Sequence, residues 1–226
     1  MEKSMIKPFI AKRVAQEFTD GMVVNLGVGL PTMCTSYLPE DVHIIVHAEL
    51  GIVGQGPKPD ATTIDAMHVV DAGGSPATVI KGGAFMDSAS NFGLIRGGHV
   101  DAVVLGGLEV DAEGSLANWI IPGKKMPGMG GAMDLLVGAK KVIVAMEHTA
   151  KGNHKILEKC KLPCTAVHCV NMIVTEMGVM EVTDKGIELV EFNPEYTIDD
   201  IQNATGAKLI IRPDVKPMDL TGFEAI

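Results

Sequence analysis

The chain has 226 residues, of which 46% are hydrophobic and 4% are aromatic, and its formal net charge at pH 7 is −9. A chain of this length buries roughly 70% of its unfolded surface, so we expect residues 1–226 to form one domain around a sizeable core. The negative charge argues against a nucleic-acid surface, which needs a basic patch. It does not exclude an anionic ligand, because backbone N–H groups also bind anions.

The N-terminal segment and the apolar runs bear on where the protein works. Residues 1–8 contain no apolar stretch typical of a signal peptide. No apolar run reaches the ~18 residues that a membrane-spanning helix needs. We therefore expect a cytoplasmic protein with no membrane partner.

The four cysteines fit no disulfide framework in a chain of this length. Cys160, Cys164, His168 and Cys169 cluster loosely, but their gaps do not match the close pairs of a zinc site. We interpret the cysteines as buried small apolar residues and expect no metal site.

The first half of the chain alternates helices and strands. Apolar residues at helical spacing predict a helix over residues 8–18, with Pro8 in its first turn. Apolar runs predict strands at 22–26 and 43–48, and Pro31 is placed to begin a helix over 31–38. Between them, Gly27-Val28-Gly29 lacks the third glycine of a dinucleotide-binding motif, since Thr32 stands there. This segment is therefore either a tight strand-to-helix turn or a place where the backbone contacts a ligand.

The second half continues this alternation. Apolar runs predict a helix-like stretch at 133–137 and strands at 102–105, 141–146, 171–175 and 209–211. Asp184-Lys185-Gly186 separates two short apolar runs, which is typical of a hairpin. Thr197 and Asp200 resemble a capping box at the start of a helix over 197–204, which Gly206 would end. Residues 51–98 are too rich in glycine and proline to assign. The alternation predicts a three-layer α/β fold with a mostly parallel sheet.

Glu49 is the main candidate for a functional residue. An apolar strand stops at this carboxylate, and ligands of open α/β sheets bind at the carboxyl ends of strands. A lone carboxylate there can serve as an acid, a base or a nucleophile. His47 lies two residues earlier on the same strand face, where it either tunes the carboxylate or packs beside it.

A glycine-rich loop is the second candidate. Gly128, Gly130 and Gly131 come just before the helix-like stretch, where free backbone N–H groups can bind a phosphate or an oxyanion. A connecting loop without function explains the glycines equally well. Combined with Glu49, an oxyanion-binding loop suits acyl transfer through a covalent acyl-glutamate.

Five segments, taken in order, resemble the β subunit of family I CoA-transferases. This family includes acetoacetate and butyrate CoA-transferases and the C-terminal half of the mammalian succinyl-CoA:3-oxoacid enzyme. The likeness extends from about residue 7 to residue 217. Its segments are NLGVGLPT at 25–32, ELGIVG at 49–54, LIRGGHVD at 94–101, LANW at 116–119 and GMGGAMDL at 128–135.

The resemblance implies a CoA-transferase fold, a ping-pong mechanism and roles for single residues. Glu49 would be the nucleophile that carries CoA as a glutamyl thioester, and the backbone N–H of Gly131 would stabilise the oxyanion. Gly51, Gly106 and Gly130 would lie at the CoA or the substrate. A CoA thioester would be the substrate, with no permanently bound cofactor. A separate α subunit would complete an α₂β₂ enzyme.

The chain departs from the family beside the nucleophile, where Ala48 and Leu50 replace the usual serine and asparagine. A more apolar site favours a short aliphatic or 3-oxo acyl group, such as butyryl, acetoacetyl or acetyl, over a dicarboxylate. Two alternatives stay open. A sugar-phosphate isomerase or deaminase would use Glu49 as a base, and an acyl-CoA sensor of this fold would need no nucleophile.

Overall fold

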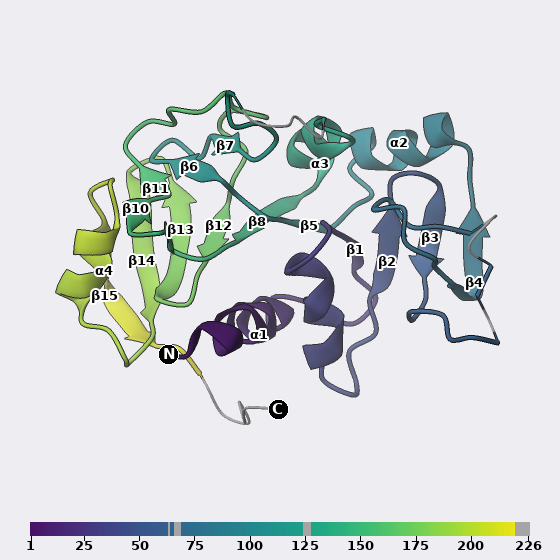
Figure 1. Ribbon diagram of the computed structural model, residues 1–226, viewed down its shortest axis with the longest axis horizontal. Helices are drawn as coiled ribbons and strands as arrows, with labels where there is room; N and C mark the ends of the chain where they lie inside the picture. The colour runs from purple at the N-terminus through teal and green to yellow at the C-terminus, as the bar shows by residue number, and fades with distance from the viewer. Residues whose placement is uncertain (63, 66–68, 124–127, 220–226) are drawn as a thin grey trace.

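The protein is described here by a computed structural model that covers residues 1–62, 64–65, 69–123 and 128–219. Ten strands form its main sheet: β1 (Val23–Leu26), β2 (Ile45–Ala48), β3 (Ile52–Gln55), β4 (Val79–Phe85), β5 (Ala102–Leu105), β8 (Lys141–Ala145), β12 (Met172–Val174), β13 (Gly178–Thr183), β14 (Gly186–Phe192) and β15 (Ile210–Pro217). Their order across the sheet is β15-β14-β13-β12-β8-β5-β1-β2-β3-β4 (Figure 1).

The centre of this sheet is parallel. Strands β12, β8, β5, β1 and β2 pair in parallel, while β3 and β4 on one side and β13 and β14 on the other pair antiparallel. All four residues of β5 are buried, as expected of a parallel strand covered on both faces. The predicted α/β fold with a mostly parallel sheet is therefore confirmed.

Helices cover both faces of the sheet. They are α1 (Lys3–Ala15), the 3₁₀ helix η1 (Pro31–Tyr37), α2 (Ser88–Arg96), α3 (Ala132–Gly138) and α4 (Ile198–Ala204). Figure 1 shows α1 on one side of the sheet and α2 and α3 on the other. Alternate residues of β5 point to opposite faces of the sheet. Val104 packs in the same hydrophobic cluster as Phe9 of α1, and Val103 packs in the same cluster as Leu135 of α3.

Two short sheets complete the fold. One contains β6 (Glu109–Asp111), β7 (Leu116–Ala117) and β11 (Ile156–Leu157), and the other pairs β9 (Thr149–Ala150) with β10 (Asn153–His154). The sequence patterns did not indicate these strands, nor β3, β4 and α2 in the unassigned stretch. No helix within the described ranges is long and apolar enough to cross a membrane.

Several expectations about the ends of elements are confirmed and others are wrong. The hairpin of β13 and β14 turns at Asp184 and Lys185, and Thr197 with Asp200 forms the capping box of α4. The first helix begins at Lys3, so Pro8 lies inside it rather than in its first turn. The segment after Pro31 is a 3₁₀ helix, in which Thr32 and Thr35 hydroxyls bond to carbonyls three residues back.

Two further corrections concern small residues. Helix α4 ends at an extended Thr205, and Gly206 is needed for space, since a Cβ there would lie 2.9 Å from Leu157 Cδ2. Of the cysteines, Cys34 alone is buried as expected, and the other three are half-buried. Cys160 lies beside the small β6 sheet, where its Sγ contacts the Ser115 carbonyl, whereas Cys169 packs against the main hydrophobic core.

Candidate active site

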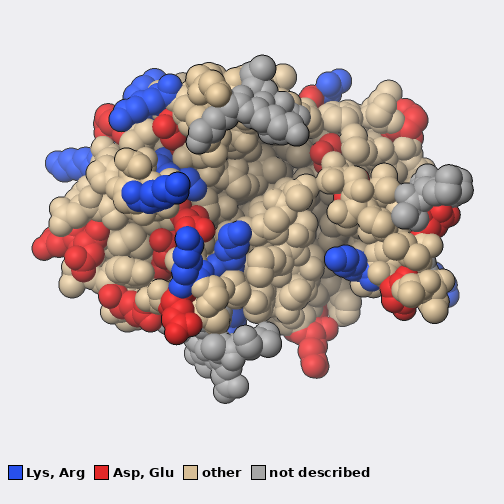
Figure 2. Space-filling view, in the orientation of Figure 1, with Lys and Arg blue, Asp and Glu red and all other residues tan. Residues whose placement is uncertain are grey.

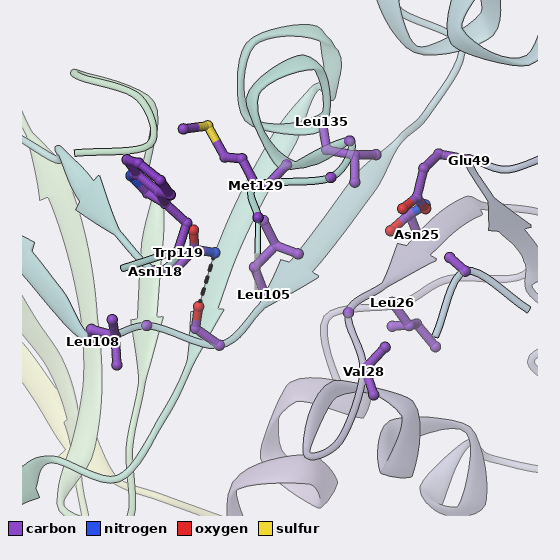
Figure 3. Close-up of a pocket in the computed structure, with 18 residues that line it drawn as sticks. Asn25, Leu26, Val28, Glu49, Leu105, Leu108, Asn118, Trp119, Met129 and Leu135 are labelled. Carbon is purple, nitrogen blue, oxygen red and sulfur yellow. Dashed lines mark hydrogen bonds between the residues drawn. The ribbon is translucent and has the colours of Figure 1, made fainter. Parts of the chain in front are cut away.

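A cavity of about 440 Å³ opens at the carboxyl ends of β1, β2 and β5 (Figure 3). Four of the five predicted site residues line it, namely Glu49, Gly106, Gly130 and Gly131. The other lining residues are Asn25, Leu26, Gly27, Val28, Ala72, Leu105, Gly107, Leu108, Asn118, Trp119, Gly128, Met129, Ala132 and Leu135. Gly51 lies outside this lining.

The turn after β2 aims Glu49 at the cavity. The carbonyl of Ala48 accepts two hydrogen bonds, from Asn91 Nδ2 at 2.7 Å and from Gly51 N at 3.0 Å. Gly51 has φ +131°, and a Cβ there would lie 2.5 Å from the Met86 carbonyl oxygen. Gly51 therefore shapes the turn that carries Glu49, whereas its predicted contact with CoA or substrate stays a prediction.

Asn25, near the end of β1, holds the Glu49 carboxylate. It is 2% exposed, and its Nδ2 donates to Glu49 Oε2 at 3.1 Å. The same Nδ2 lies 3.1 Å from Nδ1 of His47, its partner across the strand pair. Sequence reasoning gave Asn25 no role, although an amide at the end of an apolar strand is a signal of a buried polar contact.

His47 is buried beside this pair. Burial lowers the pKa of its imidazole, and the Asn91 side chain and the Glu49 charge oppose that shift. The imidazole is therefore neutral near pH 7. Of the two roles considered for His47, the structure supports more than packing, because its ring is linked to Glu49 through the Asn25 amide.

Gly131, just before α3, packs directly on the side chain of Glu49. A Cβ on Gly131 would come within 2.7 Å of Glu49 Cγ and 3.1 Å of the Phe92 ring, so only glycine fits. The backbone N–H of Gly131 makes no hydrogen bond with another described residue. The fold thus brings the predicted nucleophile and the predicted oxyanion donor together.

The far wall of the cavity carries Asn118 and Trp119, opposite Glu49 and Asn25 (Figure 3). Asn118 Nδ2 donates to the Gly106 carbonyl at 3.2 Å, and its Oδ1 accepts from Thr165 Oγ1 at 2.6 Å. Trp119 Nε1 is buried with no partner among the described residues. The LANW motif was seen in the sequence, but its place in the cavity was not.

The turn after β1 contributes Gly27 and Val28 to the lining of the cavity. Gly27 N donates to the Val104 carbonyl at 2.9 Å, and a Cβ there would lie 3.0 Å from Leu105 Cδ2. Residues 28–30 form the turn that leads from β1 to η1, and Gly29 has φ +95° there, so the predicted strand-to-helix turn is confirmed. The alternative, a backbone contact to a ligand, stays a prediction. Among the described residues of the lining, Glu49 is the one with a charged side chain.

Comparisons with known proteins identify the class of enzyme to which this chain belongs. A family model described as Coenzyme A transferase matches residues 8–204. The acetate CoA-transferase subunit beta of Escherichia coli (strain K12) is 50% identical over 210 residues, covering 92% of this chain and 95% of the relative. The mouse mitochondrial succinyl-CoA:3-ketoacid coenzyme A transferase 2B is 44% identical over 219 residues, which are 96% of this chain and 42% of that protein.

A solved structure agrees on the fold. The acyl-CoA transferase apoenzyme of Escherichia coli O157:H7 superposes with a TM-score of 0.74 at 23% identity, over 95% of this chain and 43% of that one. Together with the family match, these comparisons establish the class. The chain belongs to the coenzyme A transferase family and is the β subunit of such an enzyme. This family acts on CoA thioesters.

Proposed function

We propose that this subunit moves CoA between a short-chain acyl-CoA and a free carboxylic acid through a thioester on Glu49. The observation that carries the proposal is the contact of Glu49 with Gly131. It supports the proposal because the side chain of Glu49 packs on the residue whose N–H makes no hydrogen bond with another described residue. Acyl transfer needs such a donor where negative charge develops on the carbonyl oxygen.

The steps balance without a further reactant. A Glu49 carboxylate oxygen attacks the thioester carbonyl, and the resulting oxyanion accepts a hydrogen bond from Gly131 N–H. The C–S bond breaks, which leaves an acyl-glutamyl anhydride and CoA thiolate. The thiolate attacks the Glu49 carbonyl carbon and expels the first carboxylate as product. An acceptor carboxylate then runs the same steps in reverse to take up CoA.

We further propose that an α subunit completes the site in an α₂β₂ enzyme. The described lining offers no cation for the phosphates of CoA. Apolar side chains stand exposed around the opening, with Val28 74%, Leu50 60% and Met133 51% exposed. Figure 2 shows a hollowed, mostly uncharged band across this face, between two ends where charged side chains gather. Such a surface suits coverage by a protein partner.

The acyl group is proposed from the residues next to Glu49. Ala48 and Leu50 offer no polar side chain to a second carboxylate, so we expect butyrate, acetoacetate or acetate to be preferred over succinate as acceptor. Turnover of the co-expressed α–β complex with each acid measures this preference. A clear preference for succinate contradicts it.

Covalent capture tests the mechanism itself. The co-purified complex is incubated with an acyl-CoA and treated with borohydride, and Glu49 is then examined by peptide mass spectrometry. We expect reduction of the Glu49 side chain in the wild type and none in Glu49→Gln, which keeps the size of the side chain. Activity that depends on Glu49 without any capture would point to a general base, as in an isomerase. Saturable acyl-CoA binding without exchange would point to a sensor.

A further inference from the structure

His47 is a buried, titratable side chain that the transfer steps above do not use. It is 1% exposed and does not line the cavity. It lies in β2, directly opposite Asn25 of β1 and Val53 of β3. Burying an imidazole costs free energy unless both ring nitrogens make hydrogen bonds, so the partners of these two nitrogens decide what the side chain does.

Its tautomer follows from the hydrogen bonds around it. Asn25 Nδ2 is a donor, so Nδ1 of His47, at 3.1 Å, must accept and the ring proton resides on Nε2. Nε2 and Asn91 Oδ1 are both buried without a hydrogen-bond partner among the described residues. One is a donor and the other an acceptor, and Asn91 is fixed through its Nδ2 on the Ala48 carbonyl. The Asn91 side chain acts on the ring, since it raises the pKa of the imidazole against the effect of burial, so Oδ1 is the acceptor available to Nε2–H.

We propose that His47 is a positioning residue, which as the neutral Nε2–H imidazole keeps the N–H groups of Asn25 pointing at Glu49. The inference rests on the proposed role of Glu49 as nucleophile. Because Nδ1 occupies one N–H of the Asn25 amide, the other N–H is directed to Glu49 Oε2. Asn91 in α2 donates to the Ala48 carbonyl, which precedes Glu49, and offers its unpaired Oδ1 to the Nε2–H of His47.

Protonation of His47 would break this arrangement. An Nδ1–H would face the Asn25 N–H groups, and the amide would have to turn its oxygen toward the ring. The carboxylate of Glu49 would then lose its donor. The side chains opposite His47 on β1, β3 and α2 are the uncharged Asn25, Val53 and Asn91, and Glu49 is the charged group that acts on its ring. Turnover should therefore fall on acidification as His47 takes up a proton.

Two substitutions in the co-purified α–β complex separate positioning from packing. His47→Gln keeps an acceptor for Asn25 but cannot titrate, whereas His47→Leu fills the space without an acceptor. We expect His47→Gln to keep kcat within about threefold near neutral pH and to move the acid limb of its pH profile to lower pH. We expect His47→Leu to lose about tenfold in kcat with little change in KM. A loss of that size corresponds to one hydrogen bond, here the one that holds the Asn25 amide, which in turn donates to Glu49.

The outcomes that overturn the inference are equally distinct. Wild-type kcat in His47→Leu, or an unchanged acid limb in His47→Gln, excludes a positioning role. The ¹⁵N chemical shifts of labelled His47 report its tautomer independently of activity, and a proton on Nδ1 at neutral pH also excludes it. Covalent capture on Glu49 separates the two hypotheses. Without capture in the wild type the proposed mechanism fails, whereas capture at an equal rate in His47→Leu refutes only the positioning role.

Discussion

The backbone of Gly131 packs directly on the side chain of Glu49, so closely that a Cβ on Gly131 would lie 2.7 Å from Glu49 Cγ. Gly131 itself has φ −80°, which any residue adopts. The glycine is therefore required by space at the site and not by backbone conformation. This separation allows a substitution that affects the site and spares the fold.

We predict that Gly131→Ala lowers kcat by about 100-fold, because the methyl group displaces Glu49 from the oxyanion donor. Stability should change by less than about 1 kcal/mol, since the cavity is open on one side. Steady-state kinetics and thermal unfolding measure the two effects. Gly93→Ala in α2 is the matched control, because a Cβ there meets nothing within 4 Å. Equal kinetics of the two variants would refute the proposed contact.

A second prediction concerns the donor to Glu49. Asn25→Asp is nearly isosteric but replaces the N–H groups by an acceptor, which places two carboxyl groups side by side. We expect the rate of glutamyl-thioester formation to fall by about 100-fold or more. Rapid-quench measurement of covalent capture reports that rate. Asn153→Asp, at the exposed start of β10, is the control and should leave the rate unchanged.

Glu49, Gly131 and Asn25 show which parts of the site could be predicted from the sequence and which could not. Glu49 could be found because it ends a buried apolar run, and the hairpin at Asp184 and Lys185 because its turn residues are local signals. The contact of Gly131 with Glu49 depends on strands and loops that meet only in the folded chain. Residue-by-residue resemblance, not periodicity, indicated that pair. Asn25 was missed because an amide reveals its partners only across the β1–β2 pair.

A third prediction tests the turn that carries Glu49. Gly51→Ala faces both a φ of +131° and a Cβ contact of 2.5 Å with the Met86 carbonyl oxygen. We expect a loss of about 2–4 kcal/mol in the free energy of unfolding, together with a lower kcat as the turn shifts. Gly74→Ala has φ +76° with nothing within 4 Å, so it isolates the backbone cost of about 1 kcal/mol. If urea titrations give the two variants the same loss, the clash at Gly51 is not significant.

The last prediction uses His148, which is fully buried with its ring nitrogens 2.9 Å from the hydroxyls of Thr175 and Thr205. Burial, with smaller effects of His154 and Lys155, lowers its pKa from 6.5 to about 4. Between these values the unfolded chain binds a proton that the folded protein excludes, so stability falls as the pH drops through this window. At about 1.4 kcal/mol per pH unit, the loss is about 3 kcal/mol.

Urea unfolding at several pH values between about 7 and 4 measures this loss, and comparison with variants removes the contribution of carboxylates. His148→Gln should be less stable at neutral pH, because it loses one of the two hydroxyl contacts, but its stability should depend less steeply on pH. His43→Gln is the control, since the His43 side chain is 82% exposed and its ion pair with Asp20 lies at the surface. If the free energy of unfolding of His148→Gln falls with pH as steeply as that of the wild type, His148 does not govern acid unfolding.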